Sequence, residues 1–482
     1  MYWIVRAKWD GIHDKTDEFL KNDIWENGYD EKYQDVVKKV QEGDIILLAN
    51  GSYLEYYSKC IKNYHNGKTI SVDSWMKFET PIFIPAKGNY IKTISSLSNK
   101  TYLQRIKSYI ETGKLMEDFT INSLKITDFM SLPNQKINFA KGINIFVGEN
   151  GTGKSQILKL LYSVIDANNF IAKEKEDADY EKQRAIASSL TDIFKTKSLG
   201  NLVKKDKKET KINLELLAYD TSFSFGTSSK KEVQKISQFS KNFVFKKTIF
   251  IPTKEVLSFF PGFRVLYENK HLSFDKCYYN LCSALEVPLN KSISPNSDLI
   301  KNLEAILDGK IEIIDGEFYL VSNDNKKYEI NIVAEGLRKI GLLLYLLNNG
   351  SLDANSILFW DEPESNMHPK LIKDIVKFLV LLANRGMQIF ISTHSPYILE
   401  SFNNHLKRDK IKNMDIEDKD ILNMEPLSPR NTMAYFLNKE GLKNIFDSKV
   451  GLIDDKLLQS FNDTNMLYDK MRDIEWENNN ND

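Results

Sequence analysis

The chain has 482 residues, about three times the usual domain size, so two or three compact units are expected rather than one core. Hydrophobic residues make up 42% and charged residues 27%, which excludes a disordered or fibrous chain. The 66 basic residues balance the 66 acidic ones. A polyanionic partner would therefore have to bind a local patch, because the molecule as a whole has no net charge to attract it.

The number of cysteines and the hydropathy of the sequence indicate the cellular compartment. Three cysteines cannot build a disulfide framework, and none has zinc-type spacing, which favours a reducing compartment. The first residues lack the pattern of a secretory signal. The longest apolar runs, 340–347 and 378–383, fall short of the roughly 20 residues that a membrane helix needs. We therefore expect a cytoplasmic protein that does not enter a membrane.

Residues 1–115 are predicted to form a small β-rich domain. Four of the six tryptophans lie in this stretch among many tyrosines. Short strand-like runs are separated by turn signals such as Asn50-Gly51 and Asn66-Gly67.

Residues 116–445 alternate between strand and helix patterns, which predicts an α/β domain. Within it, 165–245 is highly charged and is predicted to be a helical insertion. Its lysine-rich part, 195–211, is interpreted either as a solvated surface or as a nucleic-acid contact. Residues 446–482 are expected to form a helical C-terminal segment with an acidic tail.

A phosphate-binding loop is predicted between the apolar run 143–147 and the helical pattern that starts at Lys154. Its glycines let backbone N–H groups wrap phosphates, and the helix N-terminus adds partial positive charge. Lys154 would reach the β- and γ-phosphates, and the Ser155 hydroxyl would bind Mg²⁺. The predicted nucleotide-binding residues are Gly148, Glu149, Asn150, Gly151, Thr152, Gly153, Lys154, Ser155 and Gln156.

Two adjacent carboxylates end the apolar strand pattern 357–360. Paired acids at a strand end repel each other and lose hydration, so a metal and a water would account for them. Asp361 is predicted to hold Mg²⁺, and Glu362 to polarise the water that attacks the γ-phosphate.

His394 follows a further apolar strand pattern, 388–392. If that strand is the parallel neighbour of the strand ending at Asp361, both ends meet at one sheet edge. His394 could then face the same γ-phosphate, and together with Lys154 and Glu362 it completes the predicted catalytic set.

Three motifs, GENGTGKS at 148–155, ILFWDEPE at 357–364 and ISTHSP at 391–396, together resemble the ABC-type ATPases of the SMC, RecF and OLD-like group over residues 118–445. The resemblance implies a P-loop ABC-type fold with a mixed sheet, ATP and Mg²⁺ as ligands, and a homodimer or higher oligomer. In such dimers two ATP molecules lie between the Walker A motif of one subunit and the signature motif of the other.

The signature motif is matched less well. Residues 333–339 resemble a degenerate form in which Ala334 replaces the usual serine, and the full LSGGQ string is absent. The resemblance implies that Glu335, Gly336 and Arg338 contact the ATP of a partner subunit. No glutamine of a Q-loop is placed, and Lys254 and Glu255 are candidates for contacts near the site.

The spacing of the motifs narrows the choice of ATPase subfamily. The stretch between Ser155 and Asp361 is too long for a minimal transporter cassette and far too short for a long coiled coil. After His394 the sequence shows no acidic constellation typical of an OLD nuclease. We therefore expect an ATPase that controls a separate effector, a nuclease or a toxin.

The first domain resembles PUA-like EVE modules through Tyr2–Val5, Gly43–Ile46 and the hairpin pattern 66–75. Such modules hold a modified base in an aromatic pocket. The alternative is that the aromatic side chains simply fill a small β-core.

The resemblance favours a sensor or regulatory subunit of a bacterial anti-phage defence system, with DNA, including modified or phage DNA, as a candidate partner. One alternative is a DNA-binding ATPase of the repair type. Another is a scaffold that ATP assembles and that turns over little. ATP hydrolysis and its stimulation by DNA would separate these hypotheses.

Overall fold

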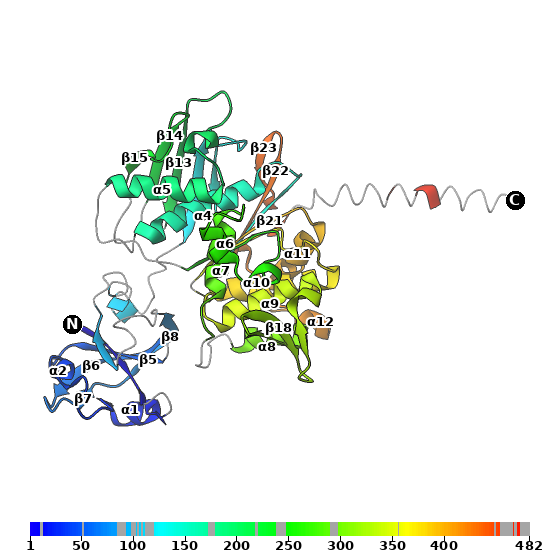
Figure 1. Cartoon of the computed structure of the whole chain (residues 1–482). Coiled ribbons are helices and arrows are strands. Elements are labelled where there is room, and N and C mark those ends of the chain that lie inside the picture. The colour runs from blue at the N-terminus through cyan, green and yellow to red at the C-terminus, as the bar shows by residue number, and fades with distance from the viewer. Residues whose placement is uncertain are drawn as a thin grey trace. The chain divides into compact units, whose positions relative to one another are not determined.

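The structure is a computed structural model that describes residues 1–9, 13–50, 53–83, 93–97, 103, 106–107, 109–110, 120–171, 179–216, 220–237, 247–289, 297–354, 356–447, 450–453, 466 and 470–472. The chain divides into two compact units, Met1–Asp118 and Phe119–Asp482 (Figure 1). In the part of the chain that is described, no helix has both the length and the hydropathy to cross a membrane.

Unit 1 is built on a seven-stranded sheet in the order β4-β7-β6-β5-β1-β9, with β8 also paired to β6. Only the β1–β5 pair is parallel. The strands are β1 (Tyr2–Arg6), β4 (Ile24–Glu26), β5 (Ile45–Asn50), β6 (Tyr53–Asn63), β7 (Thr69–Val72), β8 (Met76–Phe83) and β9 (Ile94–Ser96). A two-stranded ribbon and two short helices complete the unit: β2 (Lys8–Trp9), β3 (His13–Asp14), α1 (Thr16–Asn22) and α2 (Gln34–Val37).

Tryptophans form part of the core of unit 1. Trp3 and Trp25 are buried, and their indole N–H groups donate to Asp44 Oδ2 at 2.8 Å and to the Arg6 carbonyl at 3.0 Å. Partners of this kind satisfy the indole N–H within a core, so these two side chains fill the interior as structural residues. An aromatic base pocket in this unit stays a prediction.

Unit 2 is centred on a six-stranded sheet in the order β16-β20-β21-β12-β22-β23, in which all neighbours are parallel except β22 and β23. Its strands are β12 (Ile143–Gly148), β16 (Thr248–Ile251), β20 (Ile357–Asp361), β21 (Gln388–Thr393), β22 (Thr432–Asn438) and β23 (Gly441–Asn444). Because parallel strands are covered on both faces, they are apolar along their whole length. Ile145 and Val147 enter one hydrophobic cluster, and Phe146 between them enters the other.

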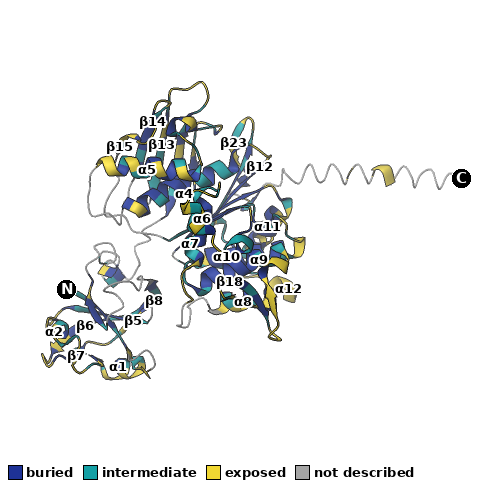
Figure 2. Cartoon of the chain, in the orientation of Figure 1, coloured by how far each residue is buried: buried dark blue, intermediate teal, exposed yellow. Residues whose placement is uncertain are grey.

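Helices supply the cover for both faces. α4 (Lys154–Ile171) packs on β20, β21 and β16, and α5 (Asp179–Ile193) packs on α4. The hydrophobic cluster that contains Ile145 and Val147 also includes residues of three helices, α9 (Glu335–Asn348), α10 (Pro369–Asn384) and α11 (Pro396–Ile411). The inward residues of these helices are buried (Figure 2). The remaining α-helices are α6 (Phe263–Glu268), α7 (Lys276–Leu285), α8 (Ser297–Leu307) and α12 (Lys419–Leu422).

The predicted helical insertion over 165–245 is wrong for its second half. After α5 and the short 3₁₀ helix Leu199–Leu202, the chain forms β13 (Glu209–Leu216), β14 (Asp220–Gly226) and β15 (Gln234–Ser237). These strands join β10 (Ile121–Thr127) and β11 (Gln135–Asn138) in an antiparallel sheet of order β11-β10-β13-β14-β15. Along β13 every second residue is buried, and this strand periodicity outweighs the helix-favouring charge of the flanking lysines.

Smaller elements complete the unit. A three-stranded sheet contains β17 (Gly309–Ile314), β18 (Glu317–Ser322) and β19 (Lys327–Glu329). Where a helical C-terminal segment is predicted, the structure forms the hairpin β24 (Phe446–Asp447) and β25 (Leu452–Ile453). Residues 466 and 470–472 are helical, and the rest of 454–482 lies outside the described residues.

One buried side chain ties the two large sheets of unit 2 together. The Gln388 amide, at the start of β21, accepts from the backbone N–H of Ile121 and donates to the carbonyls of Ile121 and Ala140, each at 2.9 Å. Gln388 is only 1% exposed, so these hydrogen bonds are shielded from water. The first residue of β10 is thereby fixed to the six-stranded sheet.

Candidate nucleotide-binding site

The loop between β12 and α4 has the geometry of a phosphate-binding loop. Gly148 has φ 154°, and a Cβ there would lie 2.0 Å from the Leu437 carbonyl oxygen. Gly151 and Gly153 also have positive φ values of 77° and 105°. Only glycine adopts such a run of conformations without strain. The loop therefore turns sharply onto the N-terminus of α4, as the sequence predicts.

Lys154 is held inside this loop. Its Nζ donates to the carbonyls of Gly148 and Glu149, both at 2.8 Å, and the residue is 5% exposed. Burial lowers the pKa of Lys154, whereas the nearby carboxylates Glu362, Asp361 and Glu364 act in the opposite direction. The ammonium group is thus placed beside the acidic ends of other strands.

The outer side of the loop is open. Glu149 and Asn150 are exposed, and the Thr152 hydroxyl donates to the Glu149 carbonyl at 2.9 Å. Gln156 on α4 accepts from the Ser131 hydroxyl at 3.0 Å, so the loop after β10 reaches the nucleotide-binding motif. Ser131 was not identified from the sequence, because it carries no motif of its own.

Ser155 and Asp361 meet, although they are far apart in the sequence. The Ser155 hydroxyl donates to Asp361 Oδ1 at 2.7 Å. Thr253, just after β16, donates to Asp361 Oδ2 at 3.2 Å, and the Ser392 hydroxyl bonds to Asp361 Oδ1. The carboxylate is therefore ringed by three hydroxyl groups from three different segments. Neither Thr253 nor Ser392 was predicted to be part of the site. The candidates near Thr253 were Lys254 and Glu255.

Glu362 and His394 lie side by side at the ends of β20 and β21. His394 Nδ1 is 3.5 Å from Glu362 Oε1. Glu362 has φ 51°, a left-handed conformation that costs a non-glycine residue energy and that clusters at functional sites. The two side chains are 26% and 48% exposed, so a ligand can reach both. The pairing brings together two of the three residues predicted to be catalytic.

The residues of the predicted signature motif contact segments other than the loop 148–156. Gly336 is in the first turn of α9, where a Cβ would be 3.1 Å from Leu371 Cδ1. Arg338 forms an ion pair with the buried Glu255 at 3.2 Å, and Glu335 accepts from the Asn366 side-chain amide at 2.9 Å. Among the described residues no hydrogen bond or ion pair joins these three to the loop 148–156.

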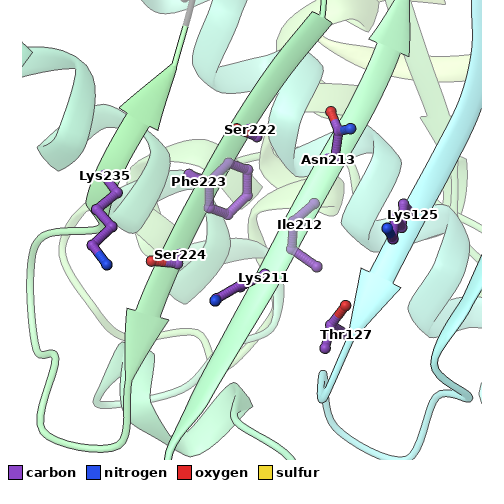
Figure 3. A pocket seen from close by; sticks show the side chains of 9 residues that line it. All are labelled: Lys125, Thr127, Lys211, Ile212, Asn213, Ser222, Phe223, Ser224 and Lys235. Atoms are coloured by element: carbon purple, nitrogen blue, oxygen red, sulfur yellow. The ribbon is translucent and has the colours of Figure 1, made fainter.

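A second polar surface lies on the outer face of the antiparallel sheet (Figure 3). A hollow of about 380 Å³ is lined by Lys125, Thr127, Lys211, Ile212, Asn213, Ser222, Phe223, Ser224 and Lys235. We call these nine residues the basic face. All three lysines are exposed, and none of the described residues that line the hollow is a carboxylate.

Carboxylates border the basic face. Glu209 lies 3.7 Å from Lys211, and Glu215 is paired with Lys136 at 2.7 Å. Glu215 and Asp220 face each other across β13 and β14 at the far end of the sheet. Glu209 also acts on Lys235 and bonds to Ser224, so it offsets part of the positive charge, and the three lysines of the basic face outnumber this one carboxylate.

A loop that turns from a central parallel strand onto a helix, with an acidic strand end and a histidine on neighbouring strands, defines a P-loop nucleotide-binding domain of the ABC type. Comparison with known families agrees. A family model described as "AAA ATPase domain" matches residues 120–277. Another, described as "AAA domain, putative AbiEii toxin, Type IV TA system", matches residues 254–400. Together with the relatives below, these matches support an ATPase domain similar to those of the SMC, RecF and OLD-like group.

Curated relatives include the Old nuclease of Escherichia phage P2, 33% identical over 128 residues, which cover 25% of this chain and 21% of the nuclease. The RecF DNA replication and repair protein of Clostridioides difficile is 26% identical over 39% of this chain and 47% of RecF. An ATP/GTP phosphatase of Helicobacter pylori is 20% identical over 58% of this chain and 86% of the phosphatase. The chain thus spans about a fifth of the Old nuclease and under half of RecF.

Similar solved structures include an SMC head bound to the C-terminal winged-helix domain of ScpA, with 12% identity and a TM-score of 0.39, covering 67% of this chain and 96% of that one. Another is the recombination mediator protein RecF with ATPγS, described as RecF-ATPrS, with 13% identity and a TM-score of 0.36, covering 68% and 98%.

Proposed function

We propose that this chain binds ATP together with Mg²⁺ at the loop 148–156 and hydrolyses it. The observation that carries the proposal is the 2.7 Å hydrogen bond between Ser155 and Asp361, which unites the two motifs that an ATP–magnesium site requires. Lys154, already fixed beside them, would bind the β- and γ-phosphates.

The residues present fit Mg²⁺. This ion prefers hard oxygen ligands and is commonly held by one or two protein groups together with substrate phosphates and water. Ser155 and Asp361 would supply such oxygens, and the Thr253 and Ser392 hydroxyls orient the Asp361 carboxylate. When bound, the ion neutralises charge that develops on the phosphates.

Hydrolysis needs a group that orients and polarises the attacking water. We assign this role to Glu362, whose strained backbone holds the carboxylate at the end of β20. His394, at 3.5 Å, would stabilise the same region of the γ-phosphate.

The decisive experiment compares ATP turnover by the wild-type chain and by Glu362→Gln, measured as phosphate release under saturating ATP and Mg²⁺. We expect Glu362→Gln to lose at least about 100-fold in rate while retaining nucleotide affinity. If the wild-type chain turns over ATP no faster than Glu362→Gln, hydrolysis is not the function, and an ATP-assembled scaffold is the better account.

We further propose that two copies close around two ATP molecules, with α9 of one copy meeting the nucleotide of the other. The N-cap residue Ala334 makes no side-chain capping hydrogen bond, and the first N–H groups of a helix have no partner within the helix, which favours an anion. Just before α9, Ile332 is an apolar side chain that is 73% exposed.

Substitution of Ala334 by glutamate tests this arrangement, because it places a negative charge at the exposed N-cap of that turn. We expect Ala334→Glu to bind ATP normally but not to dimerise with ATP when Glu362→Gln is also present. The comparison protein is Glu362→Gln alone, which should give an ATP-dependent dimer in sedimentation experiments. An unchanged dimer would exclude α9 from the interface.

The wider role that we propose is regulation of a separate effector in defence against phage. Support comes from the similarity to the Old nuclease and from the toxin–antitoxin description of the model that matches residues 254–400. The test is whether phage DNA, or DNA with modified bases, stimulates ATP turnover by the full chain more than unmodified plasmid DNA does. Equal stimulation by all of them would contradict a sensor role.

A DNA-binding ATPase of the repair type is the second candidate, and the basic face favours it. Lys125, Lys211 and Lys235 are spread over three strands of one sheet, so each could contact a phosphate of a nucleic-acid backbone. The similarity to RecF points the same way. Binding of labelled duplex DNA, measured against salt concentration, tests it. A flat salt response would exclude backbone contacts.

A further inference from the structure

Glu364 is a buried carboxylate beside the proposed hydrolytic pair, and none of the motif roles above uses it. It lies in the loop between β20 and α10, and its side chain is 7% exposed. Its Oε1 accepts from the Thr393 hydroxyl at 2.7 Å and from the backbone N–H of His394 at 3.0 Å. The Thr393 hydroxyl in turn accepts from the Ser395 N–H at 3.0 Å.

A negative charge on the buried Glu364 side chain costs folding free energy. Among the described residues, Glu364 Oε2 is buried and has no hydrogen-bond partner. Nearby is another buried charge, Lys339 of α9, which is 1% exposed and whose Nζ donates to the Ser365 carbonyl at 2.7 Å. Buried charges that are only partly compensated destabilise a fold, so a residue of this kind needs another explanation.

Contacts around Glu364 fix both members of the hydrolytic pair. Glu364 Oε1 is 3.7 Å from His394 Nδ1, and Glu362 Oε1 is 3.5 Å from the same nitrogen. On the other side of the loop, the Ser365 hydroxyl and backbone N–H donate to the Glu362 carbonyl at 2.9 and 3.1 Å. The loop thus holds Glu362 in its left-handed conformation and holds His394 against it.

We propose that Glu364 is a positioning residue for ATP hydrolysis, which fixes the end of β21 so that the His394 imidazole stays beside the Glu362 carboxylate. This inference rests on the proposed function. It predicts that Glu364 acts mainly on the rate of hydrolysis, because its hydrogen bonds are with Thr393 and His394, whereas it acts on the loop 148–156 through its charge near Lys154.

The kinetic test uses the full chain with Glu364→Ala and Glu364→Gln. Glutamine keeps an oxygen that can accept from Thr393 and His394, whereas alanine does not. We expect Glu364→Ala to lower kcat by roughly 10- to 100-fold, since small misplacements of reacting groups have effects of this size. Its affinity for ATP should stay within about twofold of wild type. Glu364→Gln should recover most of the rate.

The control is Glu400→Ala, an exposed glutamate on α11, which should behave like wild type. Thr393→Val removes only the hydroxyl and should show a smaller loss of kcat, which provides a second test if Glu364→Ala does not fold. The proposal is overturned if Glu364→Ala keeps the wild-type kcat, or if ATP affinity falls in parallel, or if Glu364→Gln is as slow as Glu364→Ala.

A second readout does not depend on turnover. The chain has six histidines, so their side-chain nitrogen resonances are few enough to be resolved by NMR. The His394 resonances are identified as the signals that are lost in His394→Gln. We expect Glu364→Ala to shift the His394 signals and Glu400→Ala to leave them in place. If the wild-type chain hydrolyses no ATP, the proposed function fails, and this measurement still tests Glu364. Unchanged His394 signals would overturn the positioning role.

Discussion

The edge of the six-stranded sheet and the basic face of the five-stranded sheet arrange polar groups in opposite ways. At the edge, Ser155, Asp361 and Lys154 are bonded to one another or to the backbone and are largely withdrawn from water. On the basic face the three lysines come from three strands of one sheet, β10, β13 and β15, with few carboxylates to offset them. Groups at the edge therefore depend on one another, whereas each lysine of the face acts by itself.

The largest expected effect on ligand affinity is at the edge, for Lys154→Ala. Loss of the ammonium removes a charge aimed at the phosphates and the two hydrogen bonds that order the loop. We expect ATP affinity to fall by roughly 10- to 100-fold, the range for hydrogen bonds to charged groups. Titration with a fluorescent ATP analogue measures it. Tighter retention of ATP by Lys154→Ala than by Glu362→Gln would contradict the roles assigned to these residues.

Next in size is the coupling between Ser155 and Asp361. We expect Ser155→Ala and Asp361→Asn each to raise the Mg²⁺ concentration needed for half-maximal turnover by about tenfold. The double variant should be little worse than either alone, because both act through one bound ion. The Mg²⁺ dependence of turnover is measured for the wild type, the two single variants and the double variant, which together form a double-mutant cycle. Fully additive effects would contradict a single Mg²⁺ ion that both residues bind.

A smaller effect is expected for Thr253→Val, which keeps the shape of the side chain but removes the hydroxyl that donates to Asp361. The net value of one such hydrogen bond is about 1 kcal/mol, so the Mg²⁺ midpoint should rise roughly fivefold or less. The control is Thr432→Val, a threonine on β22 that lies away from this carboxylate. Equal responses of the two variants would show that Thr253 has no special part in the site.

The smallest effects per residue are expected on the basic face. Lys125→Gln and Lys211→Gln should each weaken DNA binding by a fewfold and lower the slope of log affinity against log salt by about one, and the two effects should add. Lys301→Gln, an exposed lysine on α8, is the matched control. Effects that do not add would mean that the face is a specific pocket and not an electrostatic surface.

That these residues meet at one sheet edge could be predicted from the sequence, because their motifs are local. Gly148, Lys154 and Ser155 are close in the chain, and the acidic pair and His394 each lie at the end of an apolar strand, so parallel strand order alone brings them together. Glu364 lies inside the motif 357–364 but was given no role, and Thr253 belongs to no motif. Their importance comes from which side chains they touch, and a single threonine or glutamate carries no periodic signal.

The antiparallel sheet was mispredicted for a physical reason. Buried positions in β13 are Thr210, Ile212, Leu214 and Leu216, an alternation typical of a strand. The lysines around them suggested a charged helical surface, yet they only show that the other face meets solvent. One neighbour of β13 is β14, which follows it directly, but the other is β10, which lies far away in sequence, and pairing over that distance is not readable from composition.

Gln388 gives these two regions a mechanical relationship. Its amide locks the start of β10 to the start of β21, and β21 runs on to His394 at its other end. The five-stranded sheet that carries the basic face is thus connected, through one hydrogen-bonded side chain and one strand that is buried along its whole length, to the strand end that His394 follows.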